Sequence, residues 1–235
     1  MATHYKTQSG GGCLSKLFYI VVIIPVLLVG MLVYHAASPQ DLSDVGGYSP
    51  STGAVKTRDL RAILEKASKR DSTVILSETE VNLWLRENLV AKQGGKFGKN
   101  ISLDAIWVRF EDGYAELIMQ RTIMGTPFTS SMYVQIEQKI GENMAKLSLH
   151  GGPYWEELPM IKRGGHFGRL EVPQGFLLLV LPSYKKLAAA FPEELELAFT
   201  KIARCRFERD RIAFDSRQTL GDQGMPAGFS PRNLK

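Results

Sequence analysis

The sequence predicts an α+β protein with a single N-terminal transmembrane helix followed by an antiparallel sheet and helices. Three observations predict this class: a long uncharged apolar run near the N-terminus, helical apolar stripes on both sides of the central region, and a two-residue apolar period within that region. The composition, with 44% hydrophobic and 23% charged residues, is typical of a globular domain rather than of a disordered or multi-span chain.

The predicted transmembrane helix covers residues 17–37, which contain no charged side chain. A helix of about 21 residues, rising about 1.5 Å per residue, matches a hydrocarbon core of about 30 Å. A cleavable signal peptide is the alternative, but its apolar region spans only about 7–15 residues before a small-residue cleavage site. The longer run favours an uncleaved anchor.

The charges on either side of this run predict the topology. Lys6 and Lys16 precede it, whereas the first charges after it are Asp41 and Asp44. Because positive charge is retained in the cytoplasm, we expect residues 1–16 to be cytoplasmic and the rest of the chain, beyond the span, to be extracytoplasmic.

Composition divides the extracytoplasmic part into three segments. Residues 38–57 are rich in Gly, Pro, Ser and Thr and are predicted to be a linker. Residues 58–217 carry the periodic apolar patterns and form the predicted domain. Residues 218–235 contain several Gly and Pro but few apolar residues, and are predicted to be a disordered tail.

Two helices are predicted to open the domain. The first has one apolar stripe, formed by Leu60, Ile63, Leu64 and Ala67. The second begins with Ser77 and Glu80, which have the spacing of a capping box. Trp84 lies on the apolar stripe of this second helix, so we expect it in the core.

Period-two segments then predict a four-stranded meander. Residues 105–110 and 114–121 flank the Glu-Asp-Gly turn at 111–113, and two further strands cover residues 132–136 and 145–149. A terminal hairpin is predicted around Arg209 and Asp210. The segment from Gly151 to Gly168, with its many glycines, is predicted to be a loop.

The apolar run from Phe176 to Leu181 is compatible with a helix or a buried strand. A helix is favoured because good helix formers continue it from Tyr184 to Phe191. Its continuous hydrophobicity predicts that the sheet encloses it, with a groove for acyl chains or a partner helix as the alternative.

Two segments carry a resemblance to a known family. The helix opening Leu76-Ser77-Glu78-Thr79-Glu80-Val81-Asn82-Leu83-Trp84-Leu85, the meander, and the Phe167-Gly168-Arg169-Leu170-Glu171-Val172-Pro173 stretch resemble the YpmS-like family of uncharacterised bacterial single-pass envelope proteins. The resemblance covers about residues 77–217, and its motifs are structural. It implies a curved antiparallel sheet packed on helices, outside the cytoplasm, that faces lipid or another envelope protein.

Residues 94–99 and 164–169 share a Gly-Gly-basic-Phe-Gly-basic pattern, with histidine as the first basic residue of the second copy. Glycine backbone amides and basic side chains bind anions, and a phenylalanine at a loop tip can enter a membrane interface or a partner pocket. The alternative is that each phenylalanine folds back onto the core. The pattern predicts a binding site formed by Lys96, Phe97, Lys99, His166, Phe167 and Arg169.

Other chemistries find little support in the sequence. The net charge of +5 is spread too widely to predict a nucleic-acid binder, and familiar nucleophile and nucleotide motifs are absent. His150 and His166 lack ligand-spaced partners, so we expect no metal or other cofactor.

We therefore expect a non-catalytic, periplasmic envelope module that binds a lipid-like or anionic ligand, with membrane lipid or another envelope protein as its partner. The alternatives are a structural or docking subunit of an envelope or secretion assembly, and a hydrolase without a familiar motif.

Overall fold

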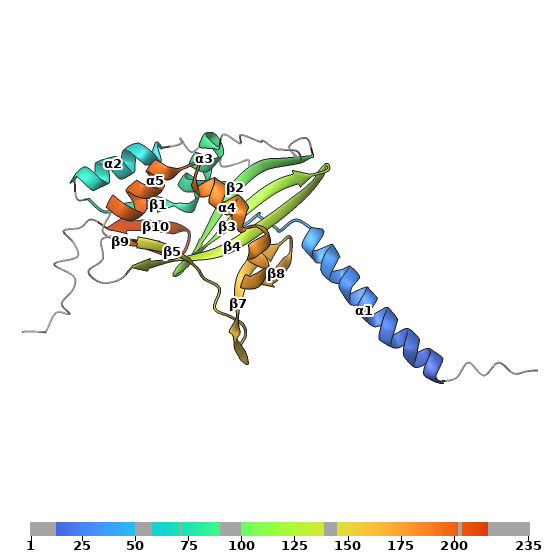
Figure 1. The fold of residues 1–235 in the computed structure, drawn as a ribbon. Coiled ribbons are helices and arrows are strands. Elements are labelled where there is room, and N and C mark those ends of the chain that lie inside the picture. The colour runs from blue at the N-terminus through green and yellow to red at the C-terminus, as the bar shows by residue number, and fades with distance from the viewer. Residues whose placement is uncertain are drawn as a thin grey trace, which may run out of the picture.

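A computed structural model describes residues 13–49, 58–70, 72–89, 100–138, 145–201 and 204–215 (Figure 1). Predicted site residues Lys96, Phe97 and Lys99 and the predicted tail lie outside this range. The elements, in chain order, are α1 (Cys13–Ala37), α2 (Leu60–Arg70), β1 (Val74–Ser77), α3 (Glu78–Asn88), β2 (Ile101–Glu111), β3 (Tyr114–Ile123), β4 (Thr126–Gln138), β5 (Ala145–Leu149), β6 (Pro153–Trp155), β7 (Leu158–Phe167), β8 (Leu170–Pro173), the 3₁₀ helix η2 (Gln174–Leu179), α4 (Leu181–Ala188), α5 (Pro192–Glu196), the π-helical turn η3 (Leu197–Lys201), β9 (Arg204–Glu208) and β10 (Arg211–Asp215).

The predicted mixture of helices and antiparallel sheets is confirmed. The described strands form a seven-stranded sheet, ordered β2-β3-β4-β7-β6 with β5 on β4 and β8 on β7, and a three-stranded sheet ordered β1-β10-β9. Every strand pair is antiparallel. The meander and the terminal hairpin are therefore confirmed.

Helix α1 is long and apolar enough to cross a membrane. Residues 18–37 have a mean hydropathy of 2.5, and the apolar side chains from Phe18 to Tyr34 are exposed rather than covered by the domain. Figure 1 shows α1 leaving the domain on the side opposite to α2 and the three-stranded sheet. An apolar helix without protein cover is compatible with the predicted anchor.

Helix α3 begins and packs as its sequence predicts. Ser77 Oγ accepts from the Glu80 amide, while the Glu80 carboxylate accepts from the Ser77 amide, so the capping box is present. Trp84 is buried, and its ring lies 5.6 Å from that of Phe191. The prediction that Trp84 belongs to the core is confirmed.

The main core lies between one face of β2–β4 and the helices with the small sheet. Its buried members include Leu60, Leu64, Leu76, Trp84, Val108, Phe110, Ala115, Val134, Leu197, Phe207, Ile212 and Phe214. The free thiol of Cys205 is buried in the same core, where it packs as a small hydrophobic residue, and burial raises its pKa.

Side chains of α3 complete the edge of the large sheet at β2. Asn82 is fully buried; its amide nitrogen donates to the Val108 carbonyl and its oxygen accepts from the Val108 amide, at 2.8 and 2.7 Å. The Glu78 carboxylate accepts from the amides of Phe110 and Gly46, both at 2.6 Å. Backbone groups that an edge strand leaves unpaired are thus satisfied by the helix.

The opposite face of the sheet carries a second apolar cluster. Leu42 and Val45 pack there with Trp107 and Ile118. Both Leu42 and Val45 belong to residues 38–57, the predicted linker. Residues 38–49 therefore lie against the sheet instead of spanning free space.

The prediction of a loop from Gly151 to Gly168 is wrong, because β6 and β7 form a hairpin there. The glycines allow strands to approach closely: a Cβ atom at Gly151 would lie 1.6 Å from the Arg163 carbonyl oxygen, and one at Gly165 would lie 2.1 Å from the Ser131 carbonyl oxygen. The sequence Gly125-Thr126-Pro127 also predicts a turn, but the turn lies at Met124 and Gly125, both with positive φ, and β4 begins at Thr126.

The run from Phe176 to Leu181 is helical, as η2 and the start of α4, but the expectation that it is enclosed by the sheet is wrong for three of its six residues. Leu177 is buried, whereas the exposed fractions of Phe176, Leu178 and Leu179 are 54%, 73% and 74%. A 3₁₀ helix has three residues per turn, so one residue in three faces the core.

Candidate functional site

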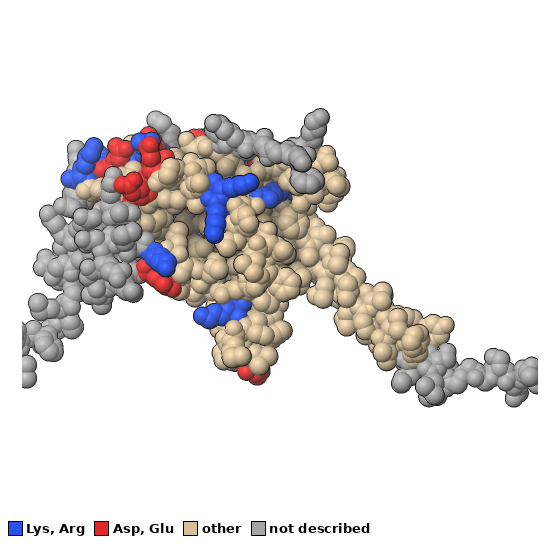
Figure 2. Space-filling view, in the orientation of Figure 1, with Lys and Arg blue, Asp and Glu red and all other residues tan. Residues whose placement is uncertain are grey.

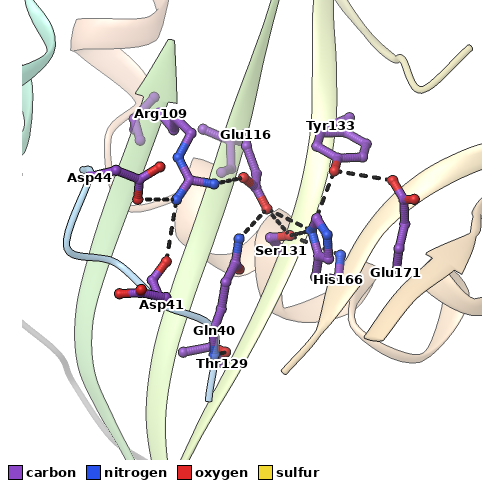
Figure 3. A network of polar contacts seen from close by, with 12 residues as sticks. Gln40, Asp41, Asp44, Arg109, Glu116, Thr129, Ser131, Tyr133, His166 and Glu171 are labelled. Carbon is purple, nitrogen blue, oxygen red and sulfur yellow. Dashed lines mark hydrogen bonds and ion pairs between the residues drawn. The ribbon is translucent and has the colours of Figure 1, made fainter. Parts of the chain in front are cut away.

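The centre of the candidate site is the carboxylate of Glu116 on β3, which is only 2% exposed (Figure 3). Its Oε2 accepts from Arg109 Nη1 at 2.6 Å. Its Oε1 accepts from Gln40 Nε2 at 3.0 Å and from Ser131 Oγ at 2.5 Å, and lies 2.9 Å from His166 Nδ1. We call these five residues the Glu116 network.

The fold brings these residues together from distant parts of the sequence. Arg109 and Glu116 are directly paired across β2 and β3, and Ser131 lies on β4 next to them. His166 comes from β7, where its backbone amide donates to Ser131 Oγ at 2.9 Å. These strands present them on the face opposite to the main core, because side chains alternate along a strand.

Arg109 connects the network to the segment that follows α1. Its Nη2 lies 2.7 Å from Asp44 Oδ1 and donates to the Asp41 carbonyl at 3.4 Å. Burial opposes the charge on Arg109, but the carboxylates of Glu116 and Asp44 outweigh it and raise the pKa of the guanidinium. Glu116 thus holds Gln40 on the sheet, and Arg109, its ion-pair partner, holds Asp44.

The carboxyl group of Glu116 is strongly stabilised in its charged form. Burial alone would raise its pKa, but hydrogen bonding and charge from His166, with Ser131 and Arg109, lower the pKa to about 2. Glu116 is therefore an anion at neutral pH, and its role is to hold the surrounding donors.

A second ionic pair lies beside His166. Tyr133 Oη is 3.4 Å from His166 Nδ1 and donates to Glu171 Oε1 at 3.3 Å, and Arg163 Nε donates to the same oxygen at 2.5 Å. Burial and the nearby carboxylates of Glu116 and Glu171 raise the pKa of Tyr133, which keeps its hydroxyl protonated.

The contacts among Ser131, His166 and Glu116 are not those of a hydrolytic triad. A carboxylate only accepts hydrogen bonds, so the contact with Glu116 places a proton on His166 Nδ1. Ser131 Oγ lies 3.4 Å from that same nitrogen, gives its own proton to Glu116 and is fully buried. In a triad the serine instead faces the other ring nitrogen, which acts as the base. This geometry is structural.

The end of α1 is seated on the turn between β7 and β8, which contains Gly168 and Arg169. The amide of Arg169 donates to the His35 carbonyl at 2.9 Å, and the amide of Gly168 donates to the Thr129 carbonyl at 2.8 Å. Gly168 has φ +54°, and a Cβ atom there would lie 2.2 Å from the Ser38 carbonyl oxygen. Only glycine fits this turn beneath the helix end without strain.

The structure therefore divides the predicted binding residues. His166 points into the Glu116 network, Phe167 is half-buried at the end of β7, and Arg169 is exposed at the seat of α1, where Nε contacts the Pro39 carbonyl at 3.3 Å. The first glycine-rich segment, residues 94–99, lies outside the described residues. The second segment is a strand end and a turn, and its glycines are explained by close backbone approach.

The sequence analysis missed Gln40, Arg109, Glu116 and Ser131 as members of one site. Their signal was weak: Arg109 and Glu116 are charged residues at positions of strands whose neighbours are apolar. Among the described residues, no group of three or more His, Cys, Asp and Glu side chains is placed to hold a metal ion.

No family model, curated protein or solved structure matches this chain. The resemblance to the YpmS-like family accordingly stays a prediction.

Proposed function

We propose that this protein is a non-catalytic, membrane-anchored envelope module whose domain is held directly on the membrane surface, where it binds an anionic, lipid-like group. The observation that carries the proposal is the seat of α1. The helix end is joined to the domain by the hydrogen bond from Arg169 to His35 and by the contacts of Gln40 and Asp44. No free linker separates the two at this point.

If α1 spans the bilayer, the hydrogen bond between Arg169 and the end of α1 fixes how deep Arg169 lies in the membrane. His35 lies in the last turn of the helix, so a residue bonded to its carbonyl lies where the chain leaves the hydrocarbon core. Headgroup phosphates lie at that level, and a guanidinium binds phosphate through paired N–H donors. These observations support the proposal that the exposed side chain of Arg169 binds an anionic headgroup.

On the face visible in Figure 2, charge elsewhere on the domain gives no stronger alternative. Figure 2 shows Lys and Arg scattered over the visible face of the domain, with the largest group of Asp and Glu near α2 and α5. The apolar surface of α1 carries no charge in this view. A local contact at the membrane surface fits this distribution better than a broad electrostatic surface does.

The topology is tested by fusing a reporter that is active only outside the cytoplasm after Arg217. Lys6 and Lys16 before the span predict an active fusion and a mature protein that retains its first residues. A silent fusion with an active cytoplasmic reporter, or an N-terminus near Ser38, would overturn the orientation or the anchor.

Lipid binding is tested by native mass spectrometry of the full chain released from nanodiscs that contain equal amounts of phosphatidylcholine and phosphatidylglycerol. We expect bound phosphatidylglycerol to be enriched, and Arg169→Ser to remove the enrichment. Lys69→Ser is the matched control, because Lys69 is an exposed cation on α2. Equal retention of both lipids by the wild-type chain, or a stoichiometric protein in place of lipid, would refute the proposal.

A further inference from the structure

We propose that the β6–β7 hairpin and η2 form a second membrane contact, which lies in the interface of the same bilayer that α1 spans. This inference rests on the proposed membrane function and adds a contact that depends on apolar area rather than on lipid charge. The two elements are called the apolar rim. Its exposed members are Trp155, Leu158, Met160, Ile161, Phe176, Leu178 and Leu179.

The hairpin exposes large apolar side chains on both of its strands. Met160 on β7 is 91% exposed, and Leu158 and Trp155 are each about half exposed. Water-exposed apolar residues usually occur singly, and a contiguous group indicates an interaction surface. Tryptophan, present here as the exposed Trp155, is a side chain that membrane interfaces favour.

Helix η2 adds an uncharged surface. Its sequence, Gln-Gly-Phe-Leu-Leu-Leu, contains no charged side chain, and three of its four large apolar residues are exposed. Leu177, the buried one, packs close to Gly164 on β7. Gln174 and Leu177 thus hold η2 against β7, and its other large apolar residues face outward.

The apolar rim is tied to the end of α1 by short connections. The turn that carries Arg169 joins β7, the second strand of the hairpin, to β8, and η2 follows β8 directly. The end of α1 is seated on that turn. Figure 1 shows the hairpin projecting from the domain toward the side on which α1 extends. A bilayer around α1 is therefore the surface that the apolar rim meets first.

Charges at the turn of the hairpin set the mode of contact. Glu156 and Glu157 form the turn, and Figure 2 shows acidic atoms at the lowest point of the hairpin. Carboxylates avoid hydrocarbon and are repelled by anionic lipid. The hairpin is accordingly expected to lie along the headgroup layer with Trp155, Leu158 and Met160, which share one face, toward the acyl chains, and to do so in zwitterionic lipid.

Tryptophan fluorescence tests this arrangement in the intact chain. The protein has three tryptophans, of which Trp84 and Trp107 are buried and Trp155 is exposed. The chain is reconstituted in nanodiscs of phosphatidylcholine, with and without bromine on the acyl chains. We expect brominated lipid to quench the emission of the wild-type chain, and Trp155→Phe to abolish the quenched component.

Surface variants identify the contact. Met160→Asp combined with Leu178→Asp is expected to reduce the quenching, because both side chains are exposed and their replacement leaves the core intact. Ile75→Asp is the matched control, since Ile75 is an exposed apolar residue on β1 in the small sheet. Unchanged quenching in the double variant would contradict the assignment of the apolar rim.

Two further outcomes are decisive. Absence of lipid quenching with full access of acrylamide to Trp155 would show that the hairpin faces water and would overturn the inference. Protection of Trp155 from acrylamide without lipid quenching would assign the surface to a protein partner instead. Arg169→Ser leaves the quenching in phosphatidylcholine unchanged, so failure of the headgroup proposal and failure of this inference are distinguished.

Discussion

Replacing Glu116 by glutamine removes the charge at the centre of the Glu116 network and preserves the length of the side chain. The pKa of Glu116 is lowered from 4.5 to about 2 in the folded protein. At about 1.4 kcal/mol per pKa unit, the folded state gains about 3 kcal/mol from the ionised carboxylate. Because the folded pKa is depressed, this stability is present above pH 4.5 and is lost as the pH falls toward about 2.

The amide of glutamine also fails to replace the bonds of the carboxylate. It can accept from one side only, so Arg109 or His166 loses its acceptor while it remains partly buried. Removal of one partner from a buried ion pair typically destabilises a protein by about 3–5 kcal/mol. We expect Glu116→Gln to lower the free energy of unfolding by that amount at pH 7, and the difference from the wild type to shrink as the pH falls below about 4.5.

Chemical unfolding of the full chain in a mild detergent, followed by tryptophan emission, measures this effect. Trp107 packs with Leu42 and Val45 on the same face of the sheet and reports on it directly. Glu65→Gln is the matched control, because Glu65 forms an exposed pair with Arg61 at 3.3 Å, and such pairs contribute at most about 1 kcal/mol. Equal stability of Glu116→Gln and the wild type at pH 7, or a difference independent of pH, would refute the reasoning.

Two further variants, Trp84→Ala and Asn82→Ala, are measured by the same unfolding assay, and a third, Gly168→Ala, is measured by hydrogen exchange. Trp84→Ala is expected to destabilise the domain by about 3–5 kcal/mol, since it leaves a cavity in the main core; an unchanged midpoint and slope would place Trp84 outside that core. Asn82→Ala leaves the amide and carbonyl of Val108 unpaired and should cost about 1–3 kcal/mol per unsatisfied group, whereas a neutral effect would mean that water replaces the amide. Gly168→Ala is expected to detach the end of α1 from the turn, because the new Cβ atom would lie 2.2 Å from the Ser38 carbonyl oxygen. We expect faster hydrogen exchange at the Arg169 amide, which donates to the His35 carbonyl. Unchanged protection of that amide would contradict the prediction.

The elements that were predicted correctly depend on neighbouring residues. The capping box of α3 needs only Ser77 and Glu80, and the β2–β3 hairpin needs only an alternating pattern around Gly113, whose φ is +87°. Such signals survive in the sequence because the contacts that they describe are local.

The β6–β7 hairpin was missed because its glycines serve contacts with distant backbone. Gly165 lies against Ser131, and Gly168 lies beneath the end of α1. In a single sequence, a glycine required by close approach looks the same as a glycine in a loop. The glycine-rich composition therefore predicted a loop, whereas the fold has a strand whose glycines allow close approach of neighbouring backbone.

The Glu116 network could not be predicted for a related reason. Gln40 and His166 lie 76 and 50 positions from Glu116, and nothing in the local pattern pairs them. The packing of residues 38–49 on the sheet could not be predicted either, because two apolar residues, Leu42 and Val45, are too few to show a helical or strand periodicity. Their partners, Trp107 and Ile118, come from β2 and β3.

The chemistry of the Glu116 network explains why charged groups occupy this face. Apolar contacts such as those of Leu42 and Val45 are non-directional and would allow the segment after α1 to slide on the sheet. Buried ionic groups add little net stability over apolar packing, but they are satisfied in one geometry only. Gln40 and Asp44 reach Glu116 and Arg109 together in a single register. The network therefore fixes the direction in which α1 leaves the domain. In the proposed arrangement, this fixed direction would keep Arg169 and the apolar rim at the level of the membrane surface.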